Sequence, residues 1–136
     1  MTEIKVIDVP TITEIKIDDE TKRKLLEQVK EEAQVIVHCS FTGQKGNNAI
    51  RIWNSTFLYS KDSSHKSKLL SSGNISVYPL WTFVPEGQTL NFTLIFTSLP
   101  KSCKYFDLVE DIPESGGFII RNIERNNTDV YLLDMN

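Results

Sequence analysis

Two cysteines and two histidines are the side chains in this sequence best suited to nucleophilic or metal chemistry. A thiol enzyme needs a cysteine, a histidine and an orienting group brought together. His38 and Cys39 are adjacent within a segment of alternating residues, so their side chains leave opposite faces of the expected strand. His65 and Cys103 have no spacing that pairs them, and the sequence holds neither C-x-x-C nor H-E-x-x-H. We therefore expect no catalytic residue, no metal site and no cofactor.

Four carboxylates near the C-terminus form the pattern D-x-x-E-D-x-x-E. They are Asp107, Glu110, Asp111 and Glu114. Such a group could bind calcium through oxygen ligands or act as an acid pair. The pattern lacks the alternating ligand positions and the turn glycine of a calcium loop, so we expect a solvated acidic strand end.

The aromatic residues of the middle third lie close in sequence to cationic residues. Flat rings give a sugar or a partner protein a large contact area at low entropic cost. The sequence therefore predicts a non-catalytic binding or protein-interaction module. The alternatives are a carbohydrate-binding module that uses exposed Trp53 and Trp81 and, less favoured, a small enzyme. The candidate ligand or partner surface comprises Arg51, Trp53, Tyr59, His65, Tyr78 and Trp81.

The composition is that of an ordinary globular domain. In 136 residues there are 15 Lys and Arg against 18 Asp and Glu, and 40% of the residues are apolar. This length suits one domain. No apolar run approaches the roughly 20 residues of a membrane helix. The first residues are polar and acidic where a signal peptide would be basic and then apolar, so we expect a cytoplasmic protein unless a leader has been removed.

Charge is unevenly distributed along the chain. Residues 35–104 hold seven basic and two acidic residues, a net charge of +5, whereas residues 1–34 and 105–136 carry −3 and −5. We interpret this as basic and acidic segments that offset one another within one fold. With a pI near 5.4 and no nucleic-acid-binding motif, the sequence does not predict a nucleic-acid partner.

Hydrophobic periodicity predicts one helix followed by strands. Residues 19–33 have a helical stripe of Leu25, Leu26, Val29 and Ala33, and Asp18 or Asp19 can cap it. The expected strands cover residues 35–41, 49–53, 56–60, 75–83, 90–96, 104–110, 118–124 and 128–134.

The last two expected strands form a hairpin around Asn126-Asn127. This pairing sets Ile123 opposite Val130 and gives the hairpin two apolar faces. One face carries Ile119, Ile123, Val130 and Leu132, which is too large a patch to be left in water. We expect the helix to cover it, or else a second copy of the chain in a homodimer.

Short strands punctuated by turns favour a β-sandwich of about seven to nine strands, with a small β-barrel as the alternative. The spacing of Cys39, Trp53 and Cys103 resembles that of immunoglobulin domains, although Lys101 replaces the tyrosine two residues before the second cysteine. Residues 90–96, the Leu99-Pro100 bend and residues 106–109 are similar to bacterial extracytoplasmic immunoglobulin-like modules.

Together with the strand pattern, this resemblance implies a mainly β, immunoglobulin-like antiparallel sandwich, and the helical spacing within residues 19–33 adds one N-terminal α-helix. Residues 1–34 would form the strand and helix extension, and residues 35–136 the sandwich core, within one domain. The resemblance also implies a disulfide between the two cysteines, whereas the lack of an export signal favours free thiols. It indicates a fold and no activity.

Overall fold

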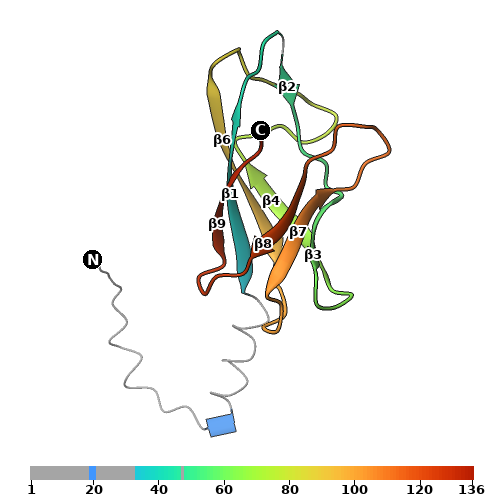
Figure 1. Cartoon of the computed structure of the whole chain (residues 1–136), viewed down its shortest axis with the longest axis vertical. Coiled ribbons are helices and arrows are strands. Elements are labelled where there is room, and N and C mark those ends of the chain that lie inside the picture. The colour runs from blue at the N-terminus through green and yellow to red at the C-terminus, as the bar shows by residue number, and fades with distance from the viewer. Residues whose placement is uncertain (1–18, 21–32, 47) are drawn as a thin grey trace, which may run out of the picture. The chain divides into compact units, whose positions relative to one another are not determined.

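A computed structural model describes residues 19–20, 33–46 and 48–136, and this part of the chain is mainly β (Figure 1). The chain divides into two compact units, Met1–Glu32 and Ala33–Asn136, and all nine strands of the described part belong to the second. Asp19 and Glu20 are helical, and most of the helix expected over residues 19–33 lies outside the described residues. Within the described ranges, no helix has the length and apolar character to cross a membrane.

Seven strands form one sheet and two short strands form another. The order in the large sheet is β8-β7-β3-β4-β6-β1-β9, and β2 pairs with β5. The bounds are β1 Gln34–Thr42, β2 Ala49–Ile50, β3 Thr56–Ser60, β4 Lys66–Gly73, β5 Thr82–Phe83, β6 Thr89–Thr97, β7 Tyr105–Glu110, β8 Ile119–Glu124 and β9 Val130–Asp134.

The large sheet is strongly curled, because β8 and β9 are its two edges and yet follow one another in the chain. In a flat sheet, seven strands about 4.8 Å apart would separate the edges by about 29 Å. The connection from Glu124 to Val130 can span only about 20 Å. Curling also brings β7 and β9 together inside the sheet, where the rings of Phe106 and Tyr131 meet edge to face with centroids 5.1 Å apart.

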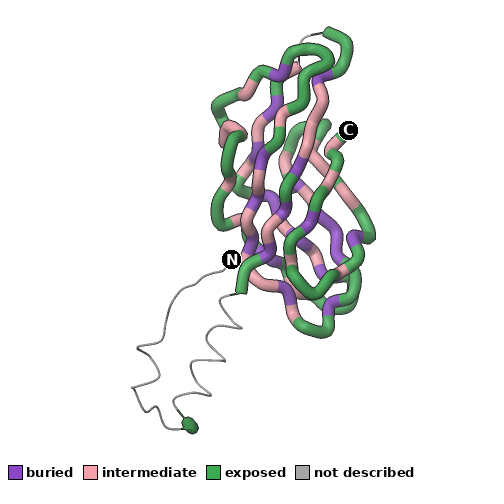
Figure 2. Tube along the Cα trace, turned by 90° about the vertical axis from the view of Figure 1, so that its left-hand side faces the viewer, coloured by how far each residue is buried: buried purple, intermediate pink, exposed green. Residues whose placement is uncertain are grey.

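Alternating side chains build the core on the concave side of this sheet. On β6, Phe92, Leu94 and Phe96 are buried, and the residues between them are not. Figure 2 shows buried and less buried residues alternating along the tube. The antiparallel register places Phe92 beside Cys39 and Leu94 beside Val37 of β1. The period of two predicted for both segments is therefore confirmed, and its apolar side faces the core.

The predicted C-terminal hairpin is wrong. β8 pairs with β7, whereas β9 pairs in parallel with β1, so the sheet is not purely antiparallel. The Asn126 side chain explains the difference. Its carboxamide oxygen accepts hydrogen bonds from the backbone N–H groups of Thr128 and Asp129, and its nitrogen donates to the Val130 carbonyl. These bonds make a wider local turn than a two-residue hairpin.

Consequently, the four residues expected on one hairpin face do not share a face. Ile123 is buried, whereas Ile119, Val130 and Leu132 are exposed. In the strand order, Ile119 lies on one edge of the sheet and the other two exposed residues lie on the opposite edge. The surface on which we expected a homodimer is therefore not formed as predicted.

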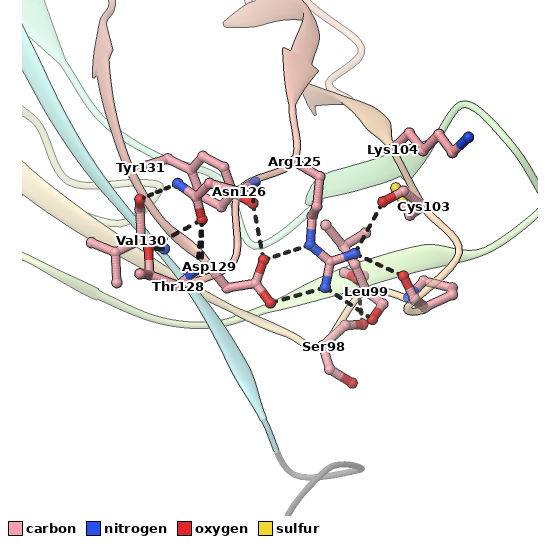
Figure 3. A network of polar contacts seen from close by, with 12 residues as sticks. Ser98, Leu99, Cys103, Lys104, Arg125, Asn126, Thr128, Asp129, Val130 and Tyr131 are labelled. Carbon is pink, nitrogen blue, oxygen red and sulfur yellow. Dashed lines mark hydrogen bonds and ion pairs between the residues drawn. The ribbon is translucent and has the colours of Figure 1, made fainter.

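Arg125 ties the connection between the two edge strands to the turn that precedes β7 (Figure 3). Its guanidinium pairs with Asp129 through two nitrogens. The same group donates to the carbonyls of Pro100 at 2.7 Å and Cys103 at 3.3 Å. The Tyr131 hydroxyl donates to Asp129 at 2.9 Å. A charged network of this kind holds the curled sheet near closure.

Candidate functional site

A short ladder between two loops brings four of the six predicted surface residues together. The backbone N–H of Ile52 donates to the Ser76 carbonyl, and that of Tyr78 donates to the Ile52 carbonyl, both at 2.9 Å. This pairing sets the segment before β5 beside the segment after β2. Arg51 and Trp53 thus lie next to Tyr78 and Trp81, from positions almost 30 residues apart.

These four residues form an aromatic–arginine cluster. The rings of Trp53 and Tyr78 stack with centroids 3.8 Å apart and an interplanar angle of 27°. The Arg51 guanidinium carbon lies 3.7 Å from the Trp81 ring centroid, 4.6 Å from that of Tyr78 and 5.7 Å from that of Trp53. Since a cation over an aromatic face is attracted by the ring quadrupole, Arg51 fixes the rings around it.

Two further contacts orient the Arg51 guanidinium. One nitrogen donates to the Pro79 carbonyl at 3.1 Å, and the other lies 3.4 Å from the Glu114 carboxylate. The Arg51 side chain is mostly buried, whereas that of Glu114 is exposed. Arg51 is therefore largely enclosed by its partners, whereas Trp81 is more than half exposed.

Large apolar side chains crowd the segment that carries Trp81. Tyr78, Leu80, Trp81 and Phe83 are each between 47% and 68% exposed. We call these four residues the 78–83 surface. The segment is held in place by a bond from the Leu80 N–H to the Val77 carbonyl, and by the Thr82 hydroxyl, which accepts from the Ser76 N–H at 2.8 Å. The exposed rings thus stand on an ordered backbone.

A cavity of about 230 Å³ lies beside the cluster. Arg51, Trp53, Trp81, Glu110 and Glu114 line it together with residues 115–116, Phe118 and other apolar residues. Glu110 is buried, and its carboxylate accepts the backbone N–H groups of Trp53 at 2.9 Å and Phe118 at 3.2 Å. Burial raises the pKa of Glu110, against the lowering effects of these two hydrogen bonds and of Arg51.

The other two predicted surface residues lie elsewhere, on β3 and directly before β4. Tyr59 belongs to β3, where its ring lies 6.0 Å from that of Phe57. The His65 Nε2 atom lies 3.0 Å from the Ser67 hydroxyl of β4 and 3.1 Å from the carbonyl of Ser98, the residue after β6, so His65 links the first residues of β4 to the end of β6. The predicted surface is therefore two groups of residues.

The four carboxylates of the acidic pattern have separate partners. Asp107 is buried and accepts the Asn122 N–H at 2.8 Å, whereas Glu110 lines the cavity and Glu114 contacts Arg51. Asp111 is exposed. In the described part of the chain, no three His, Cys, Asp or Glu side chains are grouped so that they could hold a metal ion. The expected solvated strand end holds for Asp111 and Glu114 but not for the two buried residues.

Both cysteines are free and buried. Burial raises the pKa of the Cys39 thiol to about 12, and the Cys103 thiol donates to the Tyr105 carbonyl. His38 is exposed and its Nδ1 lies 2.9 Å from the Thr93 hydroxyl. It borders a surface depression of about 570 Å³ over β1, β6 and β9, which Leu132 also lines. His38 and Cys39 thus point to opposite sides of β1, as predicted.

Sequence reasoning missed Leu80 and Glu110 as parts of this site. The run from Tyr78 to Phe83 has four large apolar residues and a proline but no alternation, which was the available signal for an exposed apolar loop.

Comparisons of the chain with protein-family models, with curated proteins and with solved structures gave no match.

Proposed function

We propose that this chain is a non-catalytic protein-interaction module that binds its partner through the 78–83 surface. The main observation behind this proposal is the exposure of four large apolar side chains within six residues, on a segment whose backbone is held by hydrogen bonds such as that from the Ser76 N–H to the Thr82 hydroxyl. Isolated exposed apolar residues are ordinary, whereas four of them within six residues, with the rings of Tyr78 and Trp81 gathered around one guanidinium, are typical of a binding site.

The surroundings of this surface support a protein partner. Interfaces are centred on tryptophan, tyrosine and arginine anchors inside a polar rim. Here Trp81 and Tyr78 supply the rings, Arg51 holds them, and Glu114 provides a charged rim. Because Arg51 holds these rings before binding, association would cost little side-chain entropy.

Carbohydrate binding is the second candidate, and the cavity is the observation that favours it. A pyranose could stack on Trp81 while its hydroxyls bond to Glu114. The two-ring platform expected from Trp53 and Trp81 is weakened, because one face of the Trp53 ring is stacked on Tyr78. We therefore favour the protein partner.

Quantitative affinity capture tests this proposal. The full chain, the Trp81→Ala variant and the Leu132→Ala variant are each immobilised and exposed to extract from the source cell, and bound proteins are compared by mass spectrometry. Leu132 is a matched control, since it is exposed on β9. We expect a protein captured by the wild type and by Leu132→Ala, and lost with Trp81→Ala. Capture that Trp81→Ala leaves unchanged contradicts the proposal, and specific glycan binding lost in Trp81→Ala would favour the carbohydrate alternative.

We also propose that the fold is an immunoglobulin-like variant from a bacterial protein and that the chain works in the cytoplasm. The curled, mainly β sheet with both cysteines in its core supports the immunoglobulin-like fold. The two free, buried thiols support the second, since reducing compartments keep thiols unpaired.

A further inference from the structure

A second group of aromatic and cationic residues lies on the convex side of the sheet, over β3, β4, β7 and β8. Cross-strand pairing sets Phe57 opposite Lys68 and Tyr59 opposite Lys66. On the other side of β3, Phe57 faces Val109 and Tyr59 faces Asp107. Val109 in turn pairs with Ile119 of β8. Two parallel rows of side chains therefore cross this part of the sheet.

Cations frame the apolar centre of these rows. The Lys66 ammonium lies 4.2 Å from the centroid of the Phe57 ring and 5.9 Å from that of Tyr59. Lys61 lies 3.3 Å and Arg121 3.6 Å from the buried Asp107 carboxylate. We call this surface the basic face; its residues are Phe57, Tyr59, Lys61, Lys66, Lys68, Asp107, Val109, Ile119 and Arg121.

The basic face has an excess of positive charge that its own residues leave uncompensated. Asp107 is the carboxylate among these residues, and it is shared by Lys61 and Arg121 and by the Asn122 N–H. Lys66 and Lys68 are both exposed residues on the neighbouring strand. Glu124, the next carboxylate along β8, lies opposite Tyr105, beyond the edge of this surface.

We propose that the basic face binds an acidic segment of a partner protein, at a site separate from the 78–83 surface. The carboxylates of the segment would pair with Lys66, Lys68 and Arg121. Its apolar side chains would lie on Phe57, Val109 and Ile119. Charge complementarity identifies this partner chemistry, because complementary charge steers association and fixes the register of a complex.

The composition of the surface favours a protein segment over a polyanion such as a nucleic acid. Phosphate backbones are bound by many cations along a groove, and the salt dependence of binding reflects their number. Here there are four cations, one buried carboxylate and a centre that includes the aliphatic side chains of Val109 and Ile119, of which Ile119 is more than half exposed. An apolar centre with a charged rim is the anatomy of a protein interface.

Selection from a random dodecapeptide display library against the immobilised full chain tests this proposal. We expect the enriched peptides to carry an excess of Asp and Glu together with aromatic or aliphatic residues. One selected peptide is then synthesised with a fluorescent label and titrated by anisotropy. Its affinity should fall about tenfold or more in the double variant Lys66→Glu/Lys68→Glu, as expected for the loss of close charge pairs. It should also fall as NaCl is raised.

Two control variants locate the binding site. Lys45→Glu reverses an exposed charge in the loop between β1 and β2, and Trp81→Ala alters the 78–83 surface. Both should leave the affinity within about twofold, since neither residue contacts the basic face. Thermal unfolding tests whether each variant is folded. If Lys66→Glu/Lys68→Glu is not folded, Lys66→Gln/Lys68→Gln takes its place.

Four results would overturn the proposal. The first is enrichment of peptides without acidic bias, and the second is binding that the double variant leaves unchanged. The third is that heparin or single-stranded DNA binds more tightly than any selected peptide and that the double variant loses this binding. The basic face would then be a polyanion site. The fourth is the loss of peptide binding in Trp81→Ala, which would assign the peptides to the 78–83 surface. That result would refute the basic face as a binding site and leave the proposed function standing.

Discussion

Replacing Arg125 with methionine should destabilise the protein far more than the same replacement at Arg121. The Arg125 side chain is 16% exposed and its partner Asp129 is 21% exposed. Methionine keeps the unbranched stem but removes the bonds to Asp129 and to the carbonyls of Pro100 and Cys103. The variant thus leaves a mostly buried carboxylate without its cation.

The magnitude follows from the partners that remain. Breaking a buried ion pair by removing one member costs about 3–5 kcal/mol. Two contacts reduce this cost, since Asp129 keeps the Tyr131 hydroxyl and the Pro100 carbonyl keeps the Cys103 N–H. We therefore expect a loss of about 3 kcal/mol, which lowers the melting temperature by about 12 °C at roughly 4 °C per kcal/mol.

Arg121 is the matched control. Its side chain is 63% exposed and its ion pair with Asp107, at 3.6 Å, is shared with Lys61. An exposed pair of this kind contributes about 0–1 kcal/mol. Thermal and urea unfolding of both variants measure the difference. A loss below about 1 kcal/mol for Arg125→Met, or equal losses for the two variants, would refute the reasoning that this network holds the sheet near closure.

Three further predictions concern single groups. Burial raises the pKa of Tyr131 to about 12 from 10, so its contribution to the free energy of unfolding is present below pH 10 and is lost between pH 10 and 12. Urea unfolding should therefore show that Tyr131→Phe loses less stability than the wild type over that pH range. Gly43→Ala should destabilise by 1 kcal/mol or more in thermal unfolding, because its Cβ would lie 2.2 Å from the Pro85 carbonyl oxygen, whereas Gly73→Ala, with open space around it, should be tolerated. Thiol titration should find two free thiols in denaturant, and Cys39 should stay unreactive in the native protein at pH 8, since its pKa is near 12.

The strands with clear alternation were predictable from the sequence. β1, β3, β6 and β7 lie where the sequence indicated strands; the first three bury alternate residues, whereas β7 also buries Asp107 on its other face. The missed strand is β4, whose polar sequence lacks this pattern. It is fixed by its neighbours β3 and β6, and its buried Ser67 donates to the Ser98 carbonyl at 2.9 Å.

The topology and the site depended on contacts that a single sequence does not display. The parallel pairing of β9 with β1 joins residues almost 100 positions apart, and a local hairpin signal at Asn126-Asn127 concealed it. Similarly, the run over residues 75–83 was predicted as one strand, but only Thr82–Phe83 pair as β5. The proline and the exposed rings of this run belong to a loop that is bonded through its backbone to Ile52 and whose Trp81 ring contacts Arg51.

Site-specific photo-crosslinking at Leu80 tests the central claim most directly. A benzoylphenylalanine placed at this exposed position extends from the 78–83 surface, and the same residue at Gln88, exposed in the turn before β6, is the control. After irradiation in the source cell, we expect one discrete protein adduct from position 80, none from position 88, and loss of the adduct when Trp81 is also changed to alanine. Absence of an adduct at position 80, or an adduct that persists without Trp81, would contradict the account.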